Sequence, residues 1–115
     1  MADAAVETTT IGCCLVARVS GAMEFQTDRV LRARFKELIA RVDRVVVLDL
    51  SGVSFCDSVG LGVLIAAWQQ AEASGAVLVV ACVPESLRLT LQISGVHQLL
   101  RAFDTVADAE AVLDC

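Results

Sequence analysis

The sequence has little basic charge. Its 115 residues carry 9 basic and 14 acidic side chains, for a net charge of −5, and Lys36 is the single lysine. An acidic domain lacks the electrostatic surface that binds a phosphate backbone or an anionic membrane, so we expect no nucleic-acid partner. The basic residues are scattered apart from one loose group on a predicted helix, which is typical of a solvated helix face. That group is Arg29, Arg32, Arg34 and Lys36.

Histidine and closely paired cysteines are also scarce. The chain has one histidine, His97, and five cysteines without a Cys-x-x-Cys pair. Because zinc needs four convergent nitrogen or sulfur ligands, usually in close pairs, the sequence predicts no metal site. We expect the cysteines to be small buried hydrophobes in a reducing compartment. A redox disulfide between Cys56 and Cys82 stays open, because each lies near the end of a predicted strand.

Long apolar runs are absent. The longest mostly apolar stretches, 59–68 and 76–84, are far shorter than a membrane span, so we expect no membrane insertion. The first ten residues are small and polar and do not resemble a secretory signal. We therefore expect a flexible N-terminus over residues 1–10, one domain over residues 11–115, and a cytoplasmic location.

The composition is rich in apolar residues, which make up 57% of the chain against 20% charged. This excess favours a mostly parallel sheet that is buried on both faces. Strand and helix patterns alternate along the chain and predict an α/β fold, with a mixed, mostly parallel sheet of four to five strands and about four helices. The predicted strands cover 11–19, 45–50, 77–83 and 99–103; the predicted helices cover 27–42, 58–74, 84–92 and 105–113.

The segment after the second predicted strand carries the clearest functional signal. Asp57 is a good helix N-cap, and Ser58 follows it in the first turn of the helix. Helix N-termini favour negative charge, so a phosphate on Ser58 would be compatible with the helix. The alternative interpretation is that both residues only cap the helix.

The helix that begins at Ser58 has two apolar faces. The face expected to pack on the sheet comprises Leu61, Leu64, Ile65 and Trp68. The second face comprises Val59, Gly62, Val63 and Ala66. Because a domain this small has little material to cover a second face, we expect that face to dock a protein. Gly60 and Gly62 indicate close packing either on the sheet or on a partner backbone.

Residues 45–67, VVVLDLSGVSFCDSVGLGVLIAA, resemble the STAS domain of bacterial anti-sigma factor antagonists. The specific core of the resemblance is D-S-x-G-L-G, which begins at Asp57. Ser20–Glu24 stands where the family has a turn before its first helix, with Ala22 and Glu24 in place of the family's Glu and Asp. Ser94-Gly95-Val96 resembles a family segment before the last strand.

The resemblance implies a phosphorylation switch. Ser58 would be phosphorylated by an anti-sigma factor with an HSP90-like serine kinase domain, and a serine phosphatase would reverse the reaction. The unphosphorylated chain would bind the anti-sigma factor and free a sigma factor. Val59 replaces the second serine of the motif, which leaves Ser58 as its one acceptor. The implied partner-binding residues are Glu24, Asp57, Ser58, Val59, Gly60, Leu61, Gly62, Val63 and Ala66.

Other readings of this segment lack key residues. A nucleophile elbow needs Gly-x-Ser-x-Gly, but Cys56 occupies its first glycine position. A receiver domain needs an acidic pair after its first strand and a lysine after its last, and residues 18–24 offer only Glu24. Nothing resembles a P-loop. We therefore expect a non-enzyme without a cofactor; the alternative is a STAS scaffold subunit of a lipid ABC transporter or of a stressosome-type complex.

Overall fold

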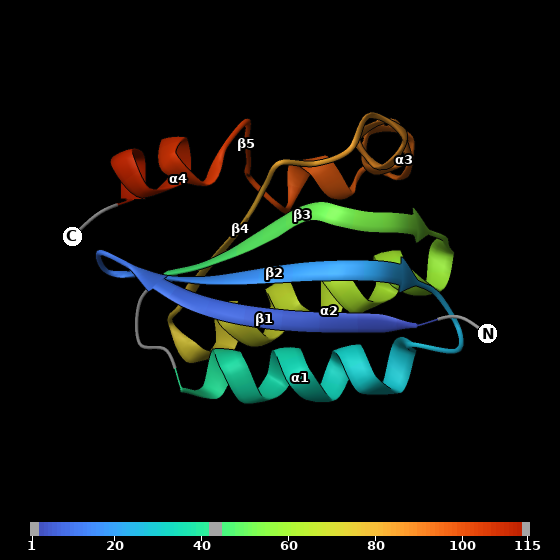
Figure 1. The fold of residues 1–115 in the computed structure, drawn as a ribbon, viewed down its shortest axis with the longest axis horizontal. Coiled ribbons are helices and arrows are strands. Elements are labelled where there is room, and N and C mark those ends of the chain that lie inside the picture. Colours follow the sequence, from blue (N-terminus) through green and yellow to red (C-terminus); the bar gives the residue numbers. More distant parts are fainter. Residues whose placement is uncertain (1–2, 42–44, 114–115) are drawn as a thin grey trace.

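The computed structural model describes residues 3–41 and 45–113, which form an α/β domain (Figure 1). Its five strands form one sheet in the order β1-β2-β3-β4-β5. The elements are β1 (Ala4–Ile11), β2 (Cys14–Met23), α1 (Asp28–Ala40), β3 (Val45–Cys56), α2 (Ser58–Ser74), β4 (Val77–Ala81), α3 (Glu85–Ser94), the 3₁₀ helix η1 (Val96–Gln98), β5 (Ala102–Phe103) and α4 (Val106–Leu113). This mixed sheet with four α-helices confirms the predicted fold class.

Where β2, β3 and β4 pair with one another, the sheet is largely buried on both faces, as the apolar composition predicts. β1 pairs with β2 in antiparallel fashion, and the other neighbouring strands are parallel. Alternate residues of β3 enter two apolar layers: Val46 and Leu48 pack with side chains of α1, α2 and α3, whereas Val45 and Val47 pack with α4. Figure 1 shows α1 and α2 together on one side of the sheet and α4 on the other.

The predicted fold is wrong mainly in the N-terminal segment. Residues 4–10, expected to be flexible, lie in β1, which pairs with β2 along its whole length through a tight turn at residues 12–13. Ala4 and Val6 pack against the core, and the threonines at 8–10 are β-branched residues that favour strands. The polar composition therefore reflects an exposed edge strand, and the domain begins before residue 11.

Several boundaries follow the predicted signals and others do not. α2 spans the predicted residues and ends at Gly75, whose left-handed φ of 76° provides the C-cap. β5 is shorter than predicted, because the chain turns and bends at residues 99–100 after η1 and enters the strand only at Ala102. Val42, the last apolar residue of the first predicted helix, lies outside the described residues.

β3 is twice as long as predicted, and this extension positions the site. Beyond Leu50 it continues beside β2 to the pair Met23 and Cys56, past the end of β4. Gly52 allows the close approach, because a Cβ there would lie 2.9 Å from the Cβ of Ser20. The carboxyl ends of β2 and β3 therefore lie side by side where α1 and α2 begin. Within the described residues, no helix combines the length and apolar character that a membrane crossing requires.

Candidate functional site

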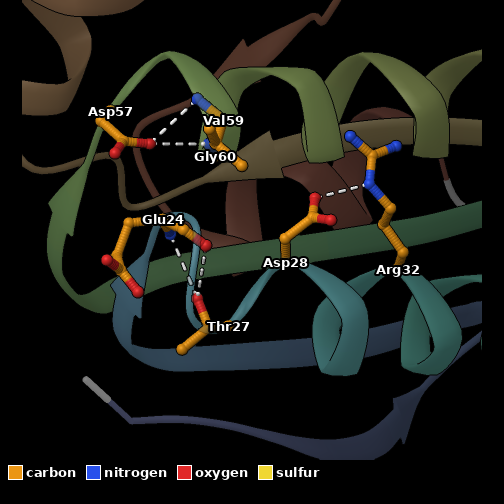
Figure 2. Close-up of polar contacts among 7 residues, drawn as sticks. All are labelled: Glu24, Thr27, Asp28, Arg32, Asp57, Val59 and Gly60. Carbon is orange, nitrogen blue, oxygen red and sulfur yellow. Dashed lines mark hydrogen bonds and ion pairs between the residues drawn. The ribbon is translucent and has the colours of Figure 1, made fainter. Parts of the chain in front are cut away.

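The start of α2 is fixed by Asp57. The residue is extended, and its carboxylate accepts hydrogen bonds from the backbone N–H groups of Val59 at 2.9 Å and Gly60 at 3.1 Å (Figure 2). This geometry confirms the predicted N-cap. Ser58 occupies the first helical position and is exposed.

Gly60 lets α2 pack directly on the turn that follows β2. A Cβ at this position would lie 2.3 Å from the carbonyl oxygen of Met23 and 2.8 Å from Sγ of Cys56. The same carbonyl accepts a hydrogen bond of 3.2 Å from the backbone N–H of Asp57. Gly60 is therefore explained by close packing inside the domain, not by the approach of a partner backbone.

The turn between β2 and α1 is held by Thr27. Thr27 is only 4% exposed, and its hydroxyl donates a hydrogen bond of 2.6 Å to the carbonyl of Ala22. The same oxygen accepts from the backbone N–H of Glu24 at 3.1 Å (Figure 2). Thr27 is the N-cap residue of α1, but its side chain makes no capping bond. It fixes the turn that carries Glu24 beside the start of α2.

The second apolar face of α2 is largely covered by α1. The prediction that this face docks a protein is therefore wrong in part. α1 packs along α2, so Val63 is 1% exposed and belongs to the core. A Cβ on Gly62 would meet the guanidinium of Arg32 at 3.3 Å, and Arg32 itself pairs with Asp28 at 2.6 Å. The prediction of an uncovered second face failed because it did not consider that the first predicted helix could pack against the second.

The predicted partner-binding residues therefore separate into two groups. Ser58 is exposed, and the residues that are partly exposed are Glu24, Asp57, Val59, Gly62 and Ala66. Gly60, Leu61 and Val63 are buried. Only the first group can contact another protein without a change in the fold, and it lies on the turn that carries Glu24 and on the first three turns of α2.

The electrostatic environment of Ser58 is acidic. Carboxylates of Glu24, Asp28 and Asp57 lie on the two segments that meet there, and Asp28 is paired with Arg32 (Figure 2). The pKa of the Cys56 thiol is raised from 9.0 to about 11, first by burial and then by the charge of Asp57. Cys56 is therefore protonated at neutral pH and poorly suited to be a nucleophile.

The cysteines differ in part from what the sequence suggested. Cys14 is buried, whereas Cys13, at the hairpin turn, is disulfide-bonded. Cys56 and Cys82 are both free, so the alternative of a disulfide between them is wrong. Ala81 pairs with Asp49, which places Cys82 near Leu50 and roughly 20 Å along β3 from Cys56. Among the described residues, no three His, Cys, Asp or Glu side chains cluster closely enough to hold a metal ion.

Replacing Asp57 tests the local geometry. Asp57→Ala removes the acceptor for two backbone N–H groups and is expected to lower the free energy of unfolding by about 1 kcal/mol. Asp57→Asn keeps an acceptor oxygen, so its free energy of unfolding should fall by less than half of that amount. Chemical denaturation of the three proteins measures the difference. Equal stability of the alanine variant and the wild type would contradict the capping role.

The fold and the site together define an α/β domain whose exposed serine starts a capped helix. The chain belongs to the STAS domain family, whose sequence model matches residues 5–109. The match begins within β1, in agreement with the corrected N-terminal boundary.

Individual relatives resemble the chain over nearly its whole length. It is 28% identical over 101 residues to an anti-sigma F factor antagonist of Paenibacillus polymyxa, covering 87% of this chain and 86% of the relative. The crystal structure of an anti-sigma factor antagonist from Mycobacterium paratuberculosis matches with a TM-score of 0.83 at 23% identity, covering 96% and 94% of the two chains. The phosphorylated form of the Bacillus cell fate determinant SpoIIAA matches with a TM-score of 0.69 at 19% identity, covering 94% and 99%. At these identities the two structures establish the shared fold.

Proposed function

We propose that this protein is an anti-sigma factor antagonist that is switched off by phosphorylation of Ser58. In its unmodified form it binds an anti-sigma factor with an HSP90-like serine kinase domain and so frees a sigma factor; a serine phosphatase restores that form. The observation that carries the proposal is the exposed Ser58 hydroxyl, placed directly after the Asp57 cap within the D-S-x-G-L-G motif. The similarity of the chain to the anti-sigma F factor antagonist of Paenibacillus polymyxa supports the same role.

The geometry around Ser58 suits a reversible phosphate. The first turn of a helix has backbone N–H groups without intrahelical partners, and its dipole favours negative charge. Phosphorylation therefore leaves the fold intact and changes only the surface that a partner meets. A solved phosphorylated form of the related SpoIIAA supports this expectation. The protein would act in the cytoplasm as a regulatory binding protein, not as an enzyme.

A scaffold role is the rival, because the fold alone does not separate an antagonist from a STAS subunit of a transporter or stressosome-type complex. The two roles differ in what they bind. An antagonist binds a kinase-type anti-sigma factor in competition with a sigma factor. A scaffold binds its own assembly and leaves the anti-sigma factor with its sigma factor.

Competition for an anti-sigma factor tests the proposal. Each kinase-type anti-sigma factor encoded in the same genome is purified with its sigma factor and mixed with the unphosphorylated chain. We expect one of these mixtures to yield a complex of the chain with the anti-sigma factor and free sigma factor on size-exclusion chromatography. Retention of every sigma factor by its anti-sigma factor would contradict the proposal and favour the scaffold role.

A further inference from the structure

Two of the four phenylalanines are strongly exposed. Phe25 exposes 78% of its surface and Phe55 exposes 55%, whereas Phe35 is buried in the core. Phe25 lies in the turn between β2 and α1, and Phe55 lies near the end of β3. Single exposed apolar residues need no explanation, but two exposed aromatic rings on adjoining segments form a candidate interaction surface.

Both phenylalanines lie beside Ser58. The backbone N–H of Asp57 donates to the carbonyl of Met23, which joins the end of β3 to the end of β2. Phe25 lies two residues after Met23, and Phe55 lies two residues before Asp57. Phe55 also faces Ala22 in the parallel register. Both residues therefore lie on segments at the end of the molecule where α2 begins; Figure 1 shows the ends of β2 and β3 there.

The surface beside Phe55 is concave. A cavity of about 180 Å³ lies between the end of β3 and α3, and its walls include Phe55, Leu87 and Thr90. It is large enough for one apolar side chain of a partner. A projecting ring at Phe25 and a hollow beside Phe55 give this end of the molecule a shape that can interlock with another protein.

The charges around the two rings indicate the chemistry of that protein. Glu24 precedes Phe25, and Asp57 follows Phe55 closely in sequence. Arg29 and Arg32 are the nearby cations on α1, and Arg32 is already paired with Asp28. The surface is therefore apolar at the rings and acidic between them, which complements a partner with apolar pockets and a basic group placed to meet Glu24.

We propose that Phe25 and Phe55 are the two anchoring residues of the surface that binds the anti-sigma factor, and that Glu24 pairs with a basic side chain of that factor. This inference rests on the proposed function and names which residues supply the binding energy. Ser58 lies three residues after Phe55, at the start of α2, so a partner that seats both rings meets the end of the molecule that carries Ser58. Aromatic side chains are the residues that most often dominate binding energy in interfaces.

Replacing the two rings separately tests the proposal. Phe25→Ser and Phe55→Ser are each expected to weaken binding of the anti-sigma factor identified in the competition experiment by about tenfold or more. Glu24→Lys should also weaken it, mainly by slowing association. Val112→Ser is the matched control, because Val112 is 55% exposed on α4 at the other end of the molecule; it should bind within about twofold of wild type.

The outcomes separate this inference from the proposed function. Thermal unfolding of each variant verifies folding, and these exposed positions should leave it nearly unchanged. If the wild type binds the anti-sigma factor and either phenylalanine variant binds it with the same affinity, the two-anchor surface alone is overturned. An equal loss of affinity in Val112→Ser would have the same consequence. Absence of binding by the wild type to every anti-sigma factor would overturn the proposed function and this inference with it.

Discussion

Ser58→Asp is expected to weaken binding of the anti-sigma factor about a hundredfold to a thousandfold without unfolding the protein. The substitution places a fixed negative charge where phosphorylation would add about −1.5 to −2 charges. Burying such a charge against a partner without a counter-ion costs about 3–5 kcal/mol, which corresponds to this loss of affinity. The helix itself tolerates the change, because an acidic residue in the first turn of α2 is favoured by the helix dipole.

Two controls separate charge at this position from charge in general. Ser58→Ala removes the acceptor hydroxyl but adds no charge, and it should bind like the wild type. Ser74→Asp adds the same charge to the same helix at its other end, roughly 24 Å away, and should leave affinity unchanged. Isothermal titration calorimetry measures the affinity of all three variants for the anti-sigma factor. Wild-type affinity in Ser58→Asp, or an equal loss in Ser74→Asp, would contradict the switch.

Gly60→Ala is expected to lower the free energy of unfolding by about 2–3 kcal/mol, although alanine is the better helix former. The added methyl group would lie 2.3 Å from the backbone carbonyl of Met23, which cannot move without shifting the turn that holds Glu24. The start of α2 must then retreat from the end of β2. Urea denaturation gives the change in stability directly.

Gly62→Ala is the matched control two residues along the same helix. Its methyl group would meet only the Arg32 guanidinium at 3.3 Å, the mobile end of a half-exposed side chain. We expect Gly62→Ala to be neutral or to stabilise the protein by up to about 1 kcal/mol through helix propensity. Destabilisation of both variants by equal amounts would show that close packing against Met23 is not what requires a glycine at position 60.

Sequence signals predicted the site best where the controlling forces are local. The cap at Asp57, the position of Ser58 in the first turn and the left-handed Gly75 all depend on residues within a few positions of each other. The buried strand at 45–50 was equally clear, because it is a continuous apolar run. These features placed the exposed serine correctly on a helix that starts at a strand end.

Features that depend on contacts between distant segments were missed. β1 is polar because it is an edge strand, and its stability comes from pairing with β2, which no local pattern reports. The burial of Val63 depends on α1 lying against α2. The hydrogen bond from Thr27 to Ala22 could have been suspected only from a threonine four residues after the strand end, which is a weak signal by itself.

Phosphorylation of Ser58 is the most direct test of the central claim. The wild type and Ser58→Ala are incubated with ATP, Mg²⁺ and the anti-sigma factor that binds the chain, and intact mass and peptide analysis follow. The account predicts one added phosphate, located on the peptide that contains Ser58 and absent from the alanine variant. A phosphate at another residue, or none on a chain that binds the anti-sigma factor firmly, would contradict a switch at Ser58.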